Sequence, residues 1–309
     1  MSPISILLLV ALISLKVFIG FRLYHWYKEG QKLQVSGYMT EGSTKIARWT
    51  FKAVCWVGTR LLVGPLWIRG QENTSYKGRG LVLPNHRITW DFGVVGKAVP
   101  YGYRQLSKAA EIKNPVIATL AAWIGTVGVQ VEGGKSQDGS GNAIVETGAK
   151  ILANSSGSRL LLFPQGKLFY DAKNEPESYR TGATRMMHRA AEIVGDAPLF
   201  VQPVGIHYIT DKREATMFQR ITYPMGMQLI RTFRYVDQAV DTEGKPLFKD
   251  GKPVWDKKKK KMVLYGAVVV IGKPIPYADL PKDPREAIEY IRVRIVAAVE
   301  EAKTVRAVA

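Results

Sequence analysis

After Gly70, short apolar runs alternate with helical stretches along the chain, and this alternation constrains the fold more than any other feature. The run from Arg159 to Phe163 is apolar after its first residue, as expected of a strand that is buried on both faces of a sheet. Strands that alternate with helices predict an α/β fold with a largely parallel central sheet flanked by helices. We expect strands near 80–83, 103–106, 127–131, 159–163, 199–206, 227–235 and 263–271, and helices over 115–123, 143–153, 181–194 and 285–306.

The N-terminal residues differ in character, which gives two predicted regions: a membrane-associated segment at 1–69 and the α/β domain at 70–309. Residues Ile4 to Phe21 are apolar apart from Lys16. A helix of that length is about 27 Å long, close to the thickness of a bilayer's hydrocarbon core. The segment lacks the basic start and the clear cleavage site of a secretory signal, so we expect a retained anchor. The sequence leaves open whether this helix spans the bilayer or lies in one leaflet.

A second apolar segment runs from Trp49 to Ile68, where Lys52 and Arg60 interrupt it and Pro65 ends a helix. Its tryptophans are typical of a membrane interface, so we expect an interfacial helix, with a core helix as the alternative. Three basic residues follow the first apolar run: Arg22, Lys28 and Lys32. They predict that the rest of the chain lies on the cytoplasmic side of the membrane.

The net charge of +18, from 44 lysines and arginines against 26 acidic residues, predicts a polyanionic partner. Nucleic acid, an anionic membrane and phosphate-bearing substrates all fit this charge. The chain lacks the aromatic and basic strand motifs and the zinc signature of nucleic-acid binders, so we expect no nucleic-acid partner. The single cysteine, Cys55, lies in an apolar run and is expected to be buried. Without a cluster of ligand residues we also expect no metal.

The most informative residues for function are His86 and Asp91, which follow the apolar run Leu81-Val82-Leu83 and then Pro84-Asn85. The turn after this strand exposes the imidazole, and the next helical turn brings the carboxylate back beside it. A carboxylate on one ring nitrogen fixes the tautomer and leaves the other nitrogen free to accept a proton. The plain alternative is a chance spacing. The pattern lacks a protein nucleophile, so a substrate hydroxyl would take that role.

Further segments with turn or polar residues also follow predicted strands, where ligands bind in open α/β sheets. Taken singly, each fits a plain turn. They are Ser107 to Pro115 with Gly125 to Val131, Leu162 to Phe169 with Tyr179 to Ala183, and Val201 to Ile206.

In this order and spacing, the segments resemble the four sequence blocks of the glycerolipid acyltransferases, the 1-acylglycerol-3-phosphate acyltransferase family. The family's first block is Asn-His, four residues and Asp, which Asn85, His86 and Asp91 match. The other blocks resemble Lys108 through Val131, Phe163 through Gly166 and Gln202-Pro203-Val204. The resemblance covers about Gly70 to Ile206 and implies the α/β fold and acyl transfer.

The chain departs from the family at several basic and acidic positions. The acidic residue of the third block is Gln165, its Thr-Arg pair is Lys167-Leu168, and the second block ends in Gln130-Val131-Glu132 without a basic residue. In the family those basic groups are associated with the acceptor's phosphate. Lys167 and Arg180 are candidate replacements, because a lysine neutralises phosphate as a point charge. Acyl transfer is therefore better supported than a glycerol-phosphate acceptor.

The resemblance implies that His86 is the general base and that Asp91 orients it. Backbone N–H groups near Gly166 would stabilise the oxyanion. The remaining predicted substrate-binding residues are Asn85, Arg87, Lys108, Gln165, Gly166, Lys167, Arg180 and Pro203.

The expected reaction moves a fatty acyl group from acyl-CoA or acyl carrier protein to a lipid hydroxyl, without a cofactor. The expected acceptor is 1-acylglycerol-3-phosphate, giving phosphatidic acid. The alternatives are another lysophospholipid or a glycolipid as the acceptor. A further alternative is that the protein is a non-catalytic lipid-binding scaffold on the same fold. Membrane lipids are the expected partners, and the sequence does not indicate an oligomeric state.

Overall fold

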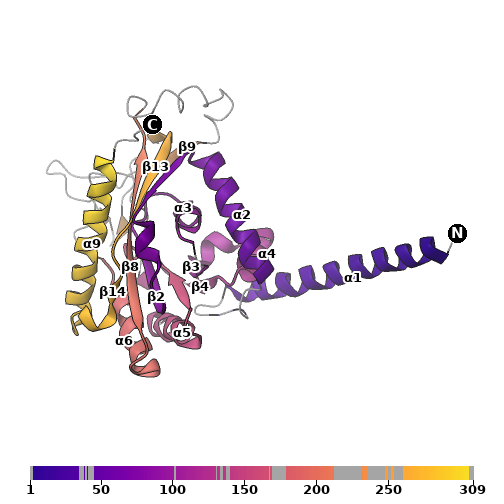
Figure 1. The fold of residues 1–309 in the computed structure, drawn as a ribbon, viewed down its shortest axis with the longest axis horizontal. Helices are drawn as coiled ribbons and strands as arrows, with labels where there is room; N and C mark the ends of the chain where they lie inside the picture. Colours follow the sequence, from indigo (N-terminus) through magenta and orange to yellow (C-terminus); the bar gives the residue numbers. More distant parts are fainter. Residues whose placement is uncertain are drawn as a thin grey trace.

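The computed structural model describes residues 3–34, 38, 40, 45–100, 102–129, 131–132, 135–136, 140–166, 168, 179–211, 231–235, 248–249, 252–253 and 260–305. Among these residues, a twisted sheet lies between two layers of helices, and a long N-terminal helix projects from the body (Figure 1). The strands of this sheet are β1 (Leu66–Arg69), β2 (Arg79–Pro84), β3 (Arg104–Lys108), β4 (Val127–Val129), β7 (Arg159–Leu161), β8 (Leu199–Ile209), β13 (Gly266–Ile271) and β14 (Ile275–Pro276).

The described helices flank the sheet or extend from it. They are α1 (Pro3–Lys32), α2 (Lys45–Leu62), α3 (Asp91–Ala98), α4 (Pro115–Trp123), α5 (Ser140–Asn154), α6 (Gly182–Val194) and α9 (Pro284–Thr304). Small antiparallel pairs lie outside the main sheet: β5 (Val131–Glu132) with β6 (Lys135–Ser136), β9 (Thr232–Tyr235) with β12 (Lys260–Val263), and β10 (Phe248–Lys249) with β11 (Lys252–Pro253). Residues 227–230 of the strand predicted at 227–235 lie outside the described residues.

The main sheet has the order β1-β13-β8-β2-β7-β3-β4, and β8 through β4 in this order run parallel. Strand β13 is antiparallel to β8, and β1 is parallel to β13. The predicted α/β fold with a largely parallel sheet is therefore confirmed. Strand β2 lies in the middle with a paired neighbour on each side, so the turn that follows it starts from a fixed position.

Side chains of β2 alternate between two apolar cores, as the two-residue period of a strand requires. Leu81 and Leu83 pack on the side of α5, α6 and α9, together with Ile291 of α9. Val82 packs on the opposite side with Val95 of α3. This alternation decides which helices lie beside each residue that follows the strand.

The apolar segment from Trp49 to Ile68 divides into a helix and a strand, on either side of Pro65, where the helix was predicted to end. Helix α2 ends at Leu62, because Gly64 adopts a positive φ of 110° and Pro65 cannot continue a helix. The side chain of Arg231 donates to the carbonyls of Arg60 and Leu61 at 2.8 and 2.9 Å and caps the helix end. Strand β1 then pairs with β13, so the sheet begins before the domain boundary predicted at residue 70.

Helix α1 is attached to the body through its C-terminal part, which packs against α4. There Trp26 and Leu33 are buried, whereas Phe18 and Phe21 are exposed on the part that projects (Figure 1). No helix in the described part of the chain combines the length and the apolar character needed to cross a bilayer. The anchor expected at residues 4–21 is therefore not supported as a membrane span.

Candidate active site

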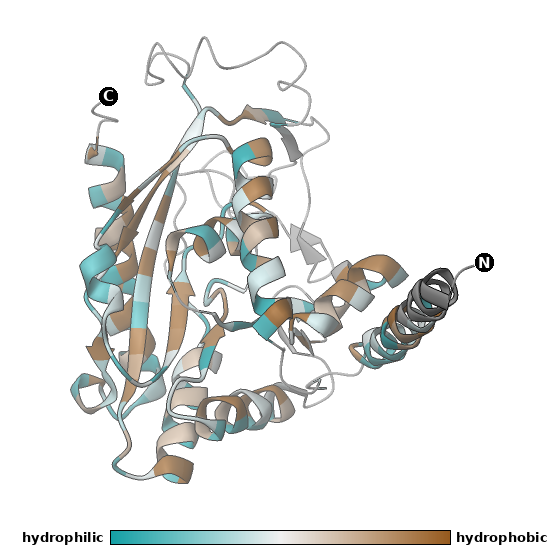
Figure 2. Cartoon of the chain, turned by 45° about the vertical axis from the view of Figure 1, so that its right-hand side comes forward, coloured by the Kyte–Doolittle hydropathy of each residue, from teal (hydrophilic) through white to brown (hydrophobic). Residues whose placement is uncertain are grey.

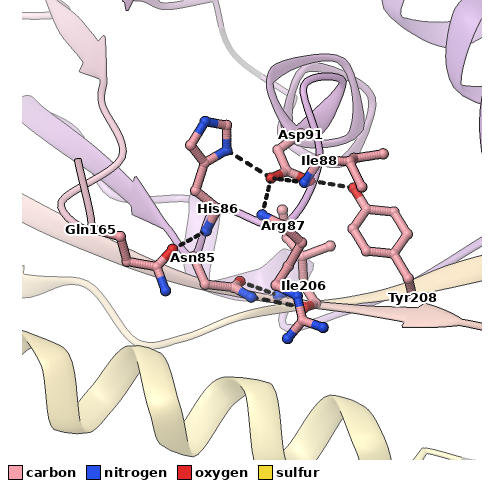
Figure 3. A network of polar contacts seen from close by, with 8 residues as sticks. All are labelled: Asn85, His86, Arg87, Ile88, Asp91, Gln165, Ile206 and Tyr208. Carbon is pink, nitrogen blue, oxygen red and sulfur yellow. Dashed lines mark hydrogen bonds and ion pairs between the residues drawn. The ribbon is translucent and has the colours of Figure 1, made fainter. Parts of the chain in front are cut away.

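The turn after β2 is fixed to the neighbouring strand β8 by the carboxamide of Asn85. The side-chain nitrogen of Asn85 donates to the carbonyl of Ile206 at 3.0 Å, and the N–H of Ile206 donates to the side-chain oxygen of Asn85 at 2.7 Å (Figure 3). These two bonds extend the pairing of β2 with β8 by one residue after the backbone has begun to turn. Asn85 is fully buried, so it holds the turn in place.

His86 and Asp91 meet as the sequence predicts. The Nδ1 atom of His86 lies 2.8 Å from Oδ2 of Asp91, and Nε2 points away from the carboxylate (Figure 3). Asp91 is the first residue of α3, where the helix N-terminus stabilises a negative charge. The carboxylate side chain is fully buried, whereas the imidazole is 19% exposed. A substrate can therefore approach the ring but cannot approach its partner.

The carboxylate of Asp91 accepts further hydrogen bonds that fix its orientation. Oδ2 also accepts from the backbone N–H groups of Arg87 at 2.5 Å and Ile88 at 3.0 Å. Oδ1 accepts from the hydroxyl of Tyr208, which projects from β8 (Figure 3). These donors stabilise the charged form of the carboxylate and direct Oδ2 toward the imidazole.

The loop after β7, the strand on the other side of β2, completes the surroundings of His86. The ring of Phe163 stacks on the imidazole with 3.8 Å between ring centroids. The side-chain oxygen of Gln165 accepts a hydrogen bond from the backbone N–H of His86. Gln165 is buried and neutral, so it adds no second negative charge beside the Asp91–His86 pair.

Two of the predicted phosphate-binding cations, Lys108 and Arg180, lie at the same end of the sheet. Val82 of β2 and Gln105 of β3 both pair with Leu161, so Lys108 reaches the height of Asn85 along the sheet. The two residues are two strand spacings apart, about 10 Å. The side chain of Lys108 is exposed there.

Arg180 joins the loop after β7 through its backbone, whose N–H donates to the carbonyl of Pro164 at 2.8 Å. Its side chain is also exposed. The N–H of Gly166 donates to the carbonyl of Phe163 at 3.1 Å, so an oxyanion donor from this loop must be another N–H group. Lys167 lies outside the described residues.

Residues 66–207 match the family model described as Acyltransferase. These residues belong to the acyltransferase family. This assignment confirms the family resemblance, and the matched segment runs from β1 through the part of β8 that holds Asn85.

The chain is also similar to the crystal structure of the 1-acyl-sn-glycerophosphate (LPA) acyltransferase PlsC from Thermotoga maritima. That similarity has a TM-score of 0.49 and 13% sequence identity, and it covers 94% of this chain and 99% of that chain. No curated protein matches the chain.

Two predicted substrate-binding residues of the acyltransferase have side chains that lie away from the His86 imidazole. The guanidinium group of Arg87 points to the α9 side of the sheet (Figure 3). Pro203 lines a cavity of about 880 Å³ beneath α9, together with Tyr290 and Ala298. The structure thus places Asn85 and Gln165 at the histidine turn, but it directs the side chains of Arg87 and Pro203 elsewhere.

The cysteine of the acyltransferase does not compete as a nucleophile. Cys55 is fully buried in α2, as predicted from its apolar run. Burial raises the pKa of its thiol to about 12, so the thiolate is scarce at neutral pH.

Sequence reasoning did not identify Tyr208 and Phe163 as parts of this site. Phe163 is the first residue of the matched third block, and this position was a usable signal. Tyr208 lies two residues beyond Ile206, and alternate residues of a strand share a face. That period places Tyr208 on the same face of β8 as Ile206, although it does not specify a contact with Asp91.

Proposed function

We propose that this acyltransferase moves a fatty acyl group from a thioester, acyl-CoA or acyl carrier protein, to a lipid hydroxyl. The proposed acceptor is 1-acylglycerol-3-phosphate, and the product is then phosphatidic acid. One observation carries the proposal: the imidazole of His86 is held by Asp91 at 2.8 Å, while its other nitrogen faces away from that carboxylate. A histidine in this arrangement is poised to accept a proton from a bound alcohol.

The proposed reaction is a direct transfer. His86 Nε2 takes the proton of the acceptor hydroxyl as the oxygen attacks the thioester carbonyl. The carbon–sulfur bond of the tetrahedral intermediate then breaks, and the leaving thiolate takes the proton back from the imidazolium. Asp91 stabilises the imidazolium between these steps and keeps the proton of the neutral ring on Nδ1. The proposal involves no acyl-enzyme, metal or cofactor.

The charges around His86 favour a phosphate-bearing acceptor. Lys108 and Arg180 are exposed at the carboxyl end of the sheet, where a phosphate group can be neutralised. Gln165 replaces the carboxylate that the family usually has, so an anionic acceptor meets one negative charge fewer beside the imidazole. The net charge of +18 further raises the local concentration of anionic lipids and of the phosphate-bearing donor.

The proposed location is the cytoplasmic surface of a membrane, and the surface of α2 supports it. A helix on a soluble domain normally exposes polar residues and buries apolar ones. Helix α2 instead exposes large apolar side chains along its length: Ile46, Trp49, Val54, Trp56, Val57 and Leu61. Contiguous exposed apolar residues mark an interaction surface, and tryptophan is typical of the lipid interface.

Helix α4 also exposes apolar side chains. Val116, Ile117 and Leu120 are exposed on it, and hydrophobic residues make up much of the helix (Figure 2). Helices α2 and α4 lie on the same side of the sheet, near the point where α1 leaves the body (Figures 1 and 2). Exposed apolar residues on two helices of the same side suit shallow insertion into one leaflet.

Helix α2 is attached directly to the catalytic turn. The indole nitrogen of Trp90, the residue before Asp91, donates to the hydroxyl of Thr59 at 3.1 Å. Gly58 lets the helix approach, because a Cβ there would lie 2.2 Å from the Trp90 ring. A helix that lies on the lipid surface would therefore keep the His86 turn close to the headgroups.

The product assay tests the proposed reaction. Purified full-length protein is mixed with vesicles of phosphatidylcholine and phosphatidylglycerol that contain one acceptor, and with either acyl-CoA or acyl carrier protein as donor. The acceptors are 1-acylglycerol-3-phosphate, other lysophospholipids and monoacylglycerol. We expect phosphatidic acid by mass spectrometry, with one thiol released per ester formed. Thioester that stays intact with every acceptor would instead identify a lipid-binding scaffold.

A vesicle-sedimentation assay tests the proposed membrane surface. Trp49→Glu on α2 removes an exposed indole and adds a negative charge, so we expect at least a tenfold loss of vesicle binding. Val293→Glu is the matched control, because Val293 is 52% exposed on α9, on the other face of the sheet. Equal losses in the two variants would remove the assignment of α2 to the lipid surface.

A further inference from the structure

Strand β8 supports the catalytic turn at two residues on one face, and both lie beyond the fourth block, Gln202-Pro203-Val204. The backbone of Ile206 holds the turn through two hydrogen bonds with the side chain of Asn85. Tyr208, two residues further, reaches the buried Asp91 through its hydroxyl (Figure 3). The proposed mechanism above uses Asp91 but assigns no role to this phenol.

The hydroxyl of Tyr208 acts as the donor in this contact. Burial, followed by the negative charge of Asp91, raises the pKa of the phenol well above its usual value, whereas Arg87 lowers it. The phenol is therefore protonated at neutral pH. A protonated phenol facing a carboxylate donates its hydrogen to that carboxylate.

The two oxygens of Asp91 are held by different parts of the chain. Oδ2 is held by local groups, namely His86 and the N–H groups of Arg87 and Ile88. Oδ1 is held by Tyr208, which is 117 residues away in the sequence and lies in a strand paired on both sides. Fixing both oxygens stops rotation of the carboxylate about its Cβ–Cγ bond, so Oδ2 stays aligned with Nδ1 of His86.

We infer that Tyr208 is a positioning residue for the reaction, which acts through Asp91 and sets the basicity of His86. The inference rests on the proposed function, since it assigns the phenol a role only if His86 is the base. The phenol draws part of the carboxylate's negative charge, and less charge then remains to stabilise the imidazolium. Tyr208 thereby limits how strongly Asp91 stabilises the imidazolium that forms during the reaction.

Tyr208→Phe tests this role, with Tyr103→Phe as the matched control. Tyr103 is also buried, and its hydroxyl donates to the carbonyl of Phe92 at 2.7 Å on the same side of the sheet. Both variants lose a buried phenol hydrogen bond, but only the first touches Asp91. For Tyr208→Phe we expect kcat to fall on the order of tenfold, as when an outer hydrogen-bond partner of an active-site ligand is removed. KM should change less than twofold.

The pH dependence separates positioning from a general loss of packing. In Tyr208→Phe the carboxylate of Asp91 regains its full charge and stabilises the imidazolium more strongly. The acid limb of the kcat/KM profile should therefore move to higher pH. Site-specific replacement of Tyr208 by 3,5-difluorotyrosine keeps the shape and strengthens the donor, so the same limb should move to lower pH. The fluorinated protein also gives the answer if Tyr208→Phe does not fold.

The outcomes separate this inference from the proposed function. Opposite shifts with the two replacements, and no shift in Tyr103→Phe, support the positioning role. If both replacements leave the acid limb unchanged while His86→Ala is inactive, the role of Tyr208 is wrong and the proposed function stands. If His86→Ala keeps wild-type activity, the proposed function itself fails.

Discussion

Two histidines of this protein each have a side-chain partner at nearly the same distance, yet their surroundings differ. His86 Nδ1 lies 2.8 Å from a carboxylate oxygen of Asp91, and His188 Nδ1 lies 2.9 Å from the hydroxyl of Tyr277. The imidazole of His86 is partly exposed, and its Nε2 points away from its partner. The Nε2 atom of His188 is buried without a hydrogen-bond partner among the described residues.

The comparison shows that a hydrogen bond to one ring nitrogen does not by itself make a histidine a base. The chemical type of the hydrogen-bond partner and the access to the second ring nitrogen decide this. A carboxylate stabilises the imidazolium that forms during catalysis, whereas a phenol does not. Burial lowers the pKa of His188, so that ring disfavours the charge that a base must take up. His188 joins α6 to the short helix at Tyr277–Asp279 and serves packing.

Replacing each histidine by glutamine gives the largest expected contrast. His86→Gln removes the base, and we expect kcat/KM to fall by about 10³- to 10⁴-fold, in the upper part of the range for general-base catalysis. His188→Gln should keep activity within about twofold, since its ring makes no contact with the site. Steady-state acyl transfer by the two purified variants measures this contrast, and equal activities would erase the distinction between the histidines.

Replacing each partner is expected to have the next largest effect. Asp91→Asn keeps the shape but removes the charge that stabilises the imidazolium and fixes its tautomer, so we expect kcat to fall by about 10²-fold. Tyr277→Phe removes the corresponding hydrogen bond of His188, and kcat should stay unchanged. Circular dichroism and the unfolding temperature provide the check on folding. A catalytic loss in Tyr277→Phe as large as in Asp91→Asn would contradict the assignment.

A third histidine, His207, gives the smallest effect, which appears in stability rather than rate. Burial, together with the nearby charges of Arg87 and Lys303, lowers the pKa of His207 to about 4, while Glu300 opposes this shift. Between pH 6.5 and about 4 the unfolded chain binds a proton here that the folded chain does not, so stability falls as the pH falls through this window. Because the ring is partly exposed, we expect a loss of about 1 kcal/mol.

Urea unfolding at pH 7 and pH 5 measures this contribution. His207→Gln should flatten the pH dependence of the unfolding free energy relative to the wild type. A dependence of the same steepness in His207→Gln would assign the titration to other groups.

The local parts of the fold and of the site could be predicted from the sequence. His86 and Asp91 are five residues apart, and a strand, a turn and the first turn of a helix suffice to bring them together. The helix predicted at 115–123 has the same bounds in the structure, because Asn114 caps it and Pro115 starts it. Such contacts depend on neighbouring residues, and neighbouring residues are visible in a sequence.

Contacts that depend on strand order could not be predicted. Asn85 and Ile206 are 121 residues apart, and they meet because β8 lies next to β2. The apolar pattern of a strand identifies its faces but not its neighbours. For the same reason β1 was missed: Leu66–Arg69 is a short run after Pro65, and its pairing with β13 is set far along the chain.

The central claim, that a lipid hydroxyl activated by His86 attacks the thioester directly, is tested by pre-steady-state thiol release. Wild-type protein is mixed rapidly with acyl-CoA or acyl carrier protein, first without an acceptor and then with 1-acylglycerol-3-phosphate in vesicles. We predict no burst of thiol without the acceptor, and steady release once the hydroxyl is supplied. A burst of one thiol per protein molecule without acceptor would reveal an acyl-enzyme and contradict the account.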